Sequence, residues 1–186
     1  MKLLKYENSK LKQQFIFTLP ATKAVCGRIC PGCYAAKPQV RFPKTVLPYR
    51  EAMLAASQQP DFAQRIISEL SSTRRSSRVV RLHESGEFYS QAYIDQWLTI
   101  AQALPNFTFY AFTKRLAHFD FSQLSVLPNF ILINSLHFGG LNYGPISSAP
   151  TDAFICPSSK GAICGTTCTY CQTKSAQSDS VYFPIH

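Results

Sequence analysis

The seven cysteines of this 186-residue chain form two clusters at opposite ends of the sequence, with none between them. Both clusters contain the spacing C-x3-C-x2-C, and together they comprise Cys26, Cys30, Cys33, Cys156, Cys164, Cys168 and Cys171. Such dense spacing indicates a set of metal ligands or a disulfide framework. A bound metal and a set of disulfides constrain a fold in different ways.

Metal ligation is favoured over disulfides. Seven thiols cannot all pair within one chain. The N-terminal residues MKLLKYENSKLKQQ are charged, whereas an export signal needs an apolar stretch of about seven residues or more. We therefore expect a cytoplasmic protein, and structural disulfides are rare in that compartment. We expect no membrane segment either, because every apolar run ends well short of the roughly 20 residues that a spanning helix needs.

The length and composition are those of a chain with one substantial core. Hydrophobic residues make up 46% of the sequence, and no stretch resembles a long linker. We expect a single domain over residues 1–186, with an α/β core over 12–145 and a cysteine-rich tail over 146–186 packed on it.

The chain is basic, with a net charge of +9. Part of this charge comes from lysines near the N-terminus and from Arg74, Arg75, Arg78 and Arg81. A basic surface favours nucleic acid or another polyanion as a partner. A solvated basic face explains the same charge without any partner.

Short strands and amphipathic helices alternate along the core. Strands are expected at 15–19, 79–83, 107–113 and 130–134, and a fifth can form over 181–185. Helices are expected after Pro48, after a cap at Asp61, after a cap at Ser90, and over 119–127. The aromatic residues of these elements, Trp97 included, are expected in the core. This alternation predicts a small, mostly parallel sheet built from βαβ units.

Polar residues follow each of the four expected core strands. The first strand leads into the first cysteine cluster, and the others are followed by His83, Glu84, Ser85, Gly86 and Glu87, by Thr113, Lys114 and Arg115, and by Asn134, Ser135 and His137. The carboxyl ends of parallel strands meet at one edge, where α/β proteins bind their ligands. The sequence therefore predicts one polar, thiol-bearing site at this edge, with Lys114 among the residues available to a cofactor.

The two cysteine clusters differ in the number of ligands that they supply. Three cysteines leave one position of a metal centre open, so a [4Fe-4S] cluster on Cys26, Cys30 and Cys33 would have one iron available to another ligand. The four tail cysteines are enough to complete a coordination shell. We expect two metal sites, both [4Fe-4S] clusters in the first interpretation, with zinc as the alternative.

The first cysteine motif and the Ser85-Gly86-Glu87 segment after the second strand resemble the radical S-adenosylmethionine (radical SAM) superfamily. The resemblance implies a truncated radical SAM partial barrel. It also implies that the open iron chelates the amino and carboxylate groups of S-adenosylmethionine. Ser85, a variant of the first glycine of a Gly-Gly-Glu motif, would then contact this cofactor together with Gly86 and Glu87.

The chain also resembles the phage-associated gene product 88 family. This likeness rests on the segments NSKL and FTLPA, the Cys-x-x-Cys-Tyr-Ala element, RLHESGEFYSQAYIDQWL, FYAFTK and the cysteine-rich tail. It implies no particular activity.

Two classes of function fit these patterns. The first is a radical SAM-like enzyme of unknown substrate, with an open three-cysteine cluster, a second four-cysteine cluster and an external electron donor. The alternative is a module stabilised by iron-sulfur or zinc sites that binds nucleic acid or protein without catalysis. In that alternative, Glu87 could open the following helix, and His83 and His137 could be polar ends of the sheet or metal ligands.

Overall fold

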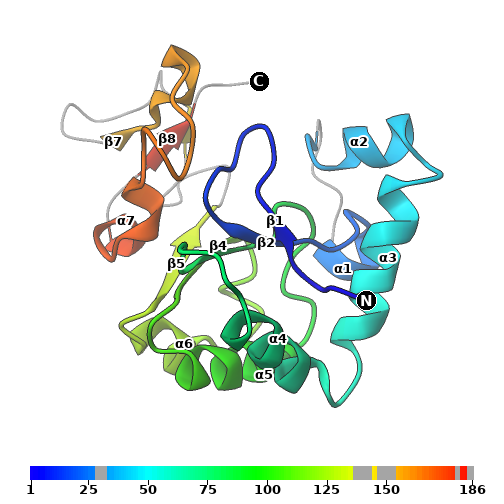
Figure 1. Ribbon diagram of the computed structural model, residues 1–186. Coiled ribbons are helices and arrows are strands. Elements are labelled where there is room, and N and C mark those ends of the chain that lie inside the picture. The colour runs from blue at the N-terminus through cyan, green and yellow to red at the C-terminus, as the bar shows by residue number, and fades with distance from the viewer. Residues whose placement is uncertain (28–32, 136–143, 146–153, 179–180, 184–186) are drawn as a thin grey trace.

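A computed structural model describes residues 1–27, 33–135, 144–145, 154–178 and 181–183. A five-stranded sheet lies at the centre of the molecule, and a small three-stranded sheet lies in the tail (Figure 1). Helices pack against the central sheet, which confirms the predicted α/β class.

The strands of the main sheet are arranged in the order in which they occur along the chain. They are β1 (Lys5–Tyr6), β2 (Phe15–Phe17), β3 (Val79–Leu82), β4 (Thr108–Thr113) and β5 (Phe130–Asn134). The β1 strand pairs antiparallel with β2, and the pairs β2–β3, β3–β4 and β4–β5 are parallel. Because each parallel strand is added on the same side, right-handed crossovers bring the connecting helices to one face of the sheet.

This helix face of the sheet carries the main core. The helices of the core are α1 (Lys23–Cys26), α2 (Ala36–Arg41), α3 (Val46–Ser57), α4 (Phe62–Ser71), α5 (Gln91–Ala103) and α6 (Ser122–Val126). The indole of Trp97 lies 5.5 Å from the ring of Phe17 and 5.6 Å from that of Phe62, measured between ring centroids. Trp97 and Phe109 are fully buried, as the sequence predicted.

The opposite face of the sheet, here called the tail face, is covered by the C-terminal segment. That segment contains β6 (Gly144–Pro145), β7 (Phe154–Ile155), the 3-10 helices η2 (Pro157–Lys160) and η3 (Tyr170–Gln172), α7 (Ser175–Ser178) and β8 (Val181–Phe183). Ala176 of α7 is buried against Tyr110, Ile131 and Ile133 of the sheet. Lys174 Nζ donates a hydrogen bond of 2.7 Å to the carbonyl of Phe130.

Several element boundaries differ from the sequence expectation. The expected strand at 181–185 exists as β8, but it pairs with β6 and β7 instead of joining the main sheet. Helix α3 begins at Val46 because Pro48 falls in its first turn, where a missing N–H leaves no hydrogen bond unmade. The side chain of Asp61 makes no capping hydrogen bond, whereas Ser90 Oγ accepts one of 3.2 Å from Tyr93 N as predicted.

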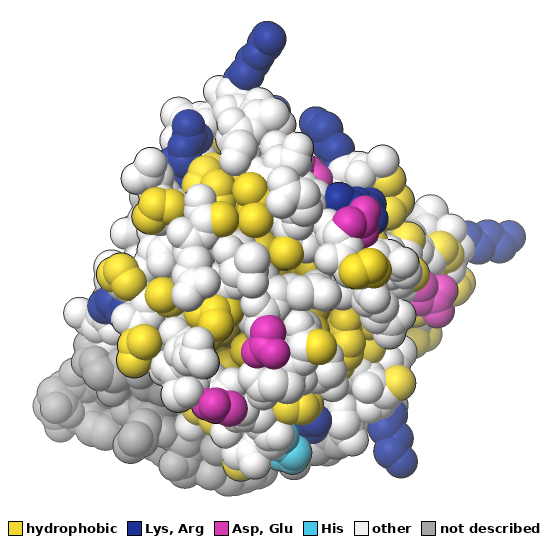
Figure 2. Space-filling view, turned by 90° about the horizontal axis from the view of Figure 1, so that it is seen from below, with side chains coloured by type: hydrophobic (Ala, Val, Ile, Leu, Met, Phe, Trp, Pro, Cys, Tyr) yellow, Lys and Arg dark blue, Asp and Glu magenta, His cyan; other side chains and the backbone are white. Residues whose placement is uncertain are grey.

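The basic residues do not gather into one patch on the side covered by α4, α5 and α6. Figure 2 shows Lys and Arg side chains spread around the rim of this face, with acidic side chains among them. Arg75 and Arg78 are exposed, as expected, and each also lies over a ring: Arg75 Cζ is 4.5 Å from the ring centroid of Tyr6 and Arg78 Cζ 5.2 Å from that of Phe107. Among the described helices, none combines the length and the apolar character needed to cross a bilayer.

Candidate functional site

The carboxyl ends of β3 and β4 are tied together by Glu87. Its Oε1 accepts hydrogen bonds from Thr113 Oγ1 at 2.8 Å and from Phe88 N at 2.9 Å, and its Oε2 accepts one from Lys114 N at 2.8 Å. Residues that the sequence placed after two different strands are therefore in direct contact. We call this edge, with the cysteine loop that follows β2, the strand-end site.

Glu87 is a buried carboxyl group, 6% exposed. Burial raises its pKa above the ordinary value, while its three hydrogen bonds act in the opposite direction. The alternative that Glu87 opens the following helix is wrong, because α5 begins at Gln91 and its N-cap is Ser90. Glu87 instead joins the loop after β3 to the end of β4.

Gly86 is required by the turn in which it lies. Its φ of 85° is in the left-handed region that favours glycine. A Cβ at this position would lie 3.1 Å from Leu19 Cα and still closer to Leu19 Cβ. The carbonyl of Ser85 accepts a hydrogen bond of 2.9 Å from Leu19 N, and Ser85 Oγ is buried without a hydrogen-bond partner among the described residues. The Ser-Gly-Glu segment is thus packed directly on the chain that leads from β2 to the cysteines.

The first cysteine loop begins at a short capped helix. Thr22 Oγ1 accepts a hydrogen bond of 3.4 Å from Val25 N at the start of α1, and Gly27 ends the helix with φ 74°. Cys26 is the last residue of α1, and Cys33 precedes α2; both are partly exposed. Cys30 lies outside the described residues.

Arg115 brings a positive charge to the base of this loop. A Cβ on Gly27 would lie 3.0 Å from Arg115 Cζ, so the guanidinium packs directly against the loop backbone. Its Nε is buried and has no hydrogen-bond partner within the described parts of the chain. The guanidinium also lies over the ring of Phe119, with Cζ 5.1 Å from the ring centroid.

Arg50 and Gln39 form a buried pair that holds the two ends of the cysteine loop, and the sequence analysis did not identify it. Arg50 Nη1 donates to the carbonyl of Ala35 at 2.6 Å and to Gln39 Oε1 at 2.8 Å. The same oxygen of Gln39 accepts a hydrogen bond of 2.6 Å from Ala21 N. Ala21 precedes α1 and Ala35 follows Cys33, so the pair fixes both ends of the loop. The available signal was Arg50 itself, a cation three positions from Met53 on the buried face of α3.

The N-terminal NSKL segment also reaches this edge of the sheet. Asn8 Nδ2 donates a hydrogen bond of 2.7 Å to Glu84 Oε1, and its Oδ1 accepts one of 2.7 Å from Leu11 N. The hydroxyl of Tyr34, just after Cys33, donates to the carbonyl of Glu84 at 3.1 Å. Glu84 thus links the N-terminal segment to the chain that leaves the cysteine loop.

His83 is turned into the core on the helix face. Side chains along β3 alternate between the two faces of the sheet, and the positive φ of His83, 57°, turns its side chain to the same face as that of Leu82. Its Nε2 lies 3.0 Å from the hydroxyl of Tyr93. Burial and the charge of Arg81 lower its pKa to about 3, so the ring is neutral at physiological pH. His83 therefore has a structural role at the end of β3, and His137 lies outside the described residues.

After β5, Ser135 N donates a hydrogen bond of 2.8 Å to the carbonyl of Thr113 and so continues the pairing of β4 with β5.

The cysteine segment of the tail is attached to the loop between β1 and β2. The carbonyl of Cys164 accepts hydrogen bonds from Lys12 N at 2.8 Å and from Gln14 Nε2 at 3.3 Å. Gly165 has φ 91°, and a Cβ there would lie 2.9 Å from the carbonyl carbon of Lys12. Gly165 N donates to the carbonyl of Cys168 at 2.9 Å, which closes a tight turn between two cysteines.

The tail cysteines differ in burial: Cys156 is buried, whereas Cys164, Cys168 and Cys171 are partly exposed. Cys33, Cys156, Cys164, Cys168 and Cys171 are outside any disulfide. Burial raises the pKa of Cys164, and it raises that of Cys171 to about 12; in both cases neighbouring cysteines add to the effect. Within the described ranges, no three Cys, His, Asp or Glu side chains are grouped closely enough to hold a metal ion. The two predicted metal sites therefore stay predictions.

Arg81 is a buried cation on the tail face. Its side chain lies over two rings of β4, with Cζ 4.9 Å from the centroid of Tyr110 and 4.3 Å from that of Phe112. Arg81 is 8% exposed, and its Nε and Nη1 have no hydrogen-bond partner in the described structure. Its assignment to a basic surface is therefore wrong. Its charge lowers the pKa of Cys164 and of Cys171, against the larger effect of burial.

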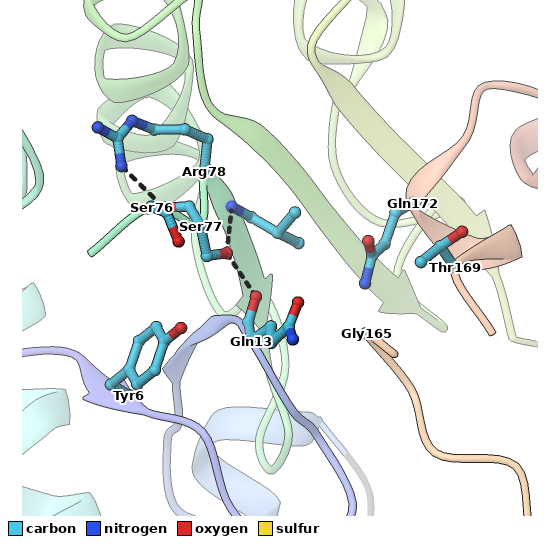
Figure 3. A pocket seen from close by; sticks show the side chains of 9 residues that line it. Tyr6, Gln13, Ser76, Ser77, Arg78, Gly165, Thr169 and Gln172 are labelled. Atoms are coloured by element: carbon cyan, nitrogen blue, oxygen red, sulfur yellow. Dashed lines mark hydrogen bonds between the residues drawn. The ribbon is translucent and has the colours of Figure 1, made fainter. Parts of the chain in front are cut away.

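A polar pocket of about 340 Å³ lies at the opposite edge of the sheet, near the amino ends of β2 and β3. Figure 3 shows Gln13 and Arg78 on one side of it and Gln172 of the tail across from them. Ser77 Oγ donates to the carbonyl of Gln13, and Arg78 Nη1 donates to the carbonyl of Ser77 at 3.0 Å. The pocket thus combines a cation with polar groups from three segments of the chain.

Comparison with protein families identifies one match. The family model described as Gene product 88 matches residues 1–145. The match includes the strand-end site and the first cysteine loop, and it ends before the tail cysteines. Curated proteins and solved structures give no match.

Proposed function

This chain belongs to the gene product 88 family, and we propose that it is an iron-sulfur protein of radical SAM type. In this proposal Cys26, Cys30 and Cys33 hold an open [4Fe-4S] cluster, and S-adenosylmethionine binds beside it at the strand-end site. The observation that carries the proposal is the contact between the segments after β2, β3 and β4, made by Leu19, Ser85, Glu87 and Lys114. The described ends of the first cysteine loop, Cys26 and Cys33, follow β2, and the Ser-Gly-Glu turn follows the neighbouring strand β3.

The order and direction of the strands support the proposed radical SAM type. The strands β2 to β5 are parallel and follow one another in chain order, and their helices pack on one face. One segment of a (β/α) barrel has this arrangement, and barrels carry their active sites on the loops at the carboxyl ends of the strands. The first cysteine loop and Glu87 are on such loops.

The residues at this edge suit a negatively charged iron-sulfur cluster. Arg115 lies against Gly27 at the start of the loop, and its buried Nε has no partner among the described residues. The cysteine ligands would be Cys26, Cys30 and Cys33. When bound, the cluster supplies the electron that cleaves S-adenosylmethionine, and the protein supplies binding and orientation.

Glu87 and Ser85 have hydrogen-bonding capacity left for a cofactor. A carboxylate offers about four lone-pair sites, and the structure gives three hydrogen bonds to Glu87. Its remaining capacity can accept a hydrogen bond from the ammonium group of S-adenosylmethionine. The buried hydroxyl of Ser85, two residues away, is a second candidate contact.

Anaerobic reconstitution with iron and sulfide tests the cluster. We expect about eight irons per chain from two cubanes, and a spectral change when S-adenosylmethionine is added. The double variant Cys26→Ser, Cys33→Ser should lose about half the iron and all of the spectral change. The matched variant Cys164→Ser, Cys168→Ser should lose iron but keep the response to the cofactor. A wild-type protein that takes up no iron, or that forms no 5'-deoxyadenosine under reduction, contradicts the proposal.

The role of Glu87 is tested by comparing a variant of Glu87 with a variant of Thr113, one of its hydrogen-bond donors. Glu87→Ala should keep the clusters and bind S-adenosylmethionine about 10 to 100 times more weakly, because a charge-assisted hydrogen bond is lost. Thr113→Val removes one donor to Glu87 but leaves the carboxylate, so its affinity should stay within about threefold of the wild type. Equal losses in both variants would mean that Glu87 acts only through the packing of this edge.

A second candidate function is a metal-stabilised module that binds nucleic acid. The polar pocket beside Arg78, together with the stacked Arg75, favours it. In that case the affinity for DNA or RNA should fall steeply between low and physiological salt, since phosphate contacts release counterions. Arg78→Ala should reduce both the affinity and its salt dependence. Weak binding that does not change with salt would exclude phosphate recognition at this pocket.

A further inference from the structure

Helix α2 lies at the outer edge of the molecule and presents an exposed face that mixes cations with an apolar side chain (Figure 1). Lys37, Val40 and Arg41 are spaced i, i+3 and i+4, so they lie on one side of the helix, and all three are exposed. Val40 is 80% exposed although it is aliphatic. The inner side of α2 carries Gln39, which is buried and hydrogen-bonded to Arg50.

An exposed aromatic ring lies at each end of this face. Tyr34, just after the first cysteine loop, is 61% exposed, and Phe42, the C-cap of α2, is 50% exposed. The guanidinium of Arg41 lies over the ring of Phe42, with Cζ 5.4 Å from the ring centroid. We call this set of exposed side chains the α2 surface: Tyr34, Lys37, Val40, Arg41, Phe42 and Lys44.

The α2 surface is positively charged. Residues 8–50 contain eight lysines and arginines and no acidic residue. None of the ion pairs between described residues includes a cation of this surface. Glu84, the acidic residue beside Tyr34, already accepts a hydrogen bond from Asn8. Charge complementarity therefore favours an anionic partner.

The composition of the α2 surface distinguishes between two kinds of anionic partner. Protein interfaces have few charged residues at their centre and are depleted in lysine, whereas Lys37 and Arg41 lie between the two exposed rings. Proteins that bind single-stranded nucleic acid combine cations along the backbone with rings that stack on bases, and arginine adds cation–π contacts. The α2 surface has this second composition. Unpaired bases can stack on a protein ring, whereas the bases of a duplex are stacked on one another.

We propose that the α2 surface binds single-stranded nucleic acid, with Tyr34 and Phe42 stacking on bases and the three cations contacting phosphates. The inference goes beyond the proposed function, because it requires neither a metal centre nor S-adenosylmethionine. It also concerns a different surface from the pocket beside Arg78. Because the Tyr34 hydroxyl donates to the carbonyl of Glu84, a strand bound here would lie next to the strand-end site.

Fluorescence anisotropy of the full-length chain with short labelled oligo(dT) and oligo(U) strands tests the stacking. At least one of these strands should bind about tenfold or more tightly than a duplex of the same length. Phe42→Ala should weaken the binding about 5- to 100-fold, the range for the loss of one base stack, and Phe42→Leu should lose nearly as much because it has no ring. Val126→Ala is the matched control, since Val126 of α6 is an equally exposed aliphatic residue elsewhere, and it should bind as the wild type does.

Salt dependence tests the phosphate contacts. The triple variant Lys37→Gln, Arg41→Gln, Lys44→Gln should reduce the slope of log affinity against log salt by about 2, because each contact with a single strand contributes about 0.7. The control triple variant Lys2→Gln, Lys5→Gln, Arg65→Gln removes the same charge from outside the α2 surface and should keep the slope of the wild type. A strand bound at the pocket beside Arg78 would give the opposite result, with a loss in Arg78→Ala and none in the α2 variants. That result overturns the inference.

A second ring covers the case in which a Phe42 variant does not fold. Tyr34→Phe keeps the ring and should bind within about threefold of the wild type, whereas Tyr34→Leu should bind about fivefold or more weakly. Equal affinities of these two variants overturn the stacking. Poly-L-glutamate added as a competitor should displace the strand less effectively, at equal charge, than an unlabelled oligonucleotide does. Equal displacement would show that the α2 surface recognises acidic protein chains, and a wild type that binds no single strand at low salt would also overturn the inference.

Discussion

The two faces of the main sheet are built on different principles. On the helix face, large apolar side chains such as Phe17, Phe62 and Trp97 are fully buried against one another. On the tail face, a much smaller apolar cluster around Ile131 and Ile133 lies beside the buried polar side chains of Arg81 and Gln14. The helix face is stabilised mainly by apolar burial, with His83 hydrogen-bonded to Tyr93 among its few buried polar groups. The tail face also contains buried polar groups, and one of them, Gln14, is hydrogen-bonded to the carbonyl of Cys164 in the tail.

Neighbouring residues of the same strands produce this difference. Along β3, Val80 and Leu82 face the helices, while Arg81 between them faces the tail. Along β4, Phe109 and Ala111 belong to the main core, while Tyr110 donates a hydrogen bond to Gln14 on the other side. Because successive side chains of a strand point to opposite faces, apolar and polar surfaces are assembled from one short sequence.

The largest expected effect concerns the helix face. Phe109→Ala should lower the free energy of unfolding by about 3 to 5 kcal/mol, because it leaves a cavity in a fully packed core. The loss should be the same with and without bound metal. Tyr110→Phe, on the next residue, removes only the hydroxyl that bonds to Gln14 and should cost about 0.5 to 1.5 kcal/mol. Urea denaturation measures both, and equal costs would contradict the contrast between the faces.

A second prediction concerns pH and again the helix face. The native pKa of His83 is lowered to about 3, so the unfolded chain binds a proton at a higher pH than the folded chain does. Stability should therefore fall as pH decreases from about 6.5, the ordinary pKa of histidine, toward 3, by up to about 1.4 kcal/mol per pH unit. His83→Asn tolerates the left-handed backbone but does not titrate, so its urea midpoint should change less between pH 7 and pH 5. An unchanged pH dependence would show that His83 is not buried in its neutral form.

The smallest expected effect on global stability concerns the attachment of the tail. Gly165→Ala places a Cβ against the carbonyl of Lys12 and should loosen the tail, while the unfolding of the core changes by about 1 kcal/mol or less. Gly161→Ala is the matched control, since it has a similar φ of 80° but no atom within 4 Å of the added Cβ. Limited proteolysis should cut the tail of Gly165→Ala faster than that of Gly161→Ala. Equal cleavage would mean that the contact with Lys12 does not hold the tail.

The sequence by itself determined the class of the fold and the place of the strand-end site. Alternating and helical periodicities located the main strands and α5, and the cap at Ser90 was identified from residue type alone. The residues after β3 and β4 were predicted to converge, and Glu87 connects them. These features depend on local pattern and on the direction of parallel strands, both of which can be derived from the sequence.

Only the tertiary structure decided which partners the polar groups have. Arg81 is buried because the tail covers its face of the sheet. Arg50 donates a hydrogen bond to the carbonyl of Ala35 because α3 approaches the cysteine loop. The turn of His83 into the helix face follows from a single positive φ. The β1 strand has two residues, too few for any periodic signal. A charged or polar residue looks the same in sequence whether it is solvated or buried, because the difference lies in contacts with residues far away along the chain.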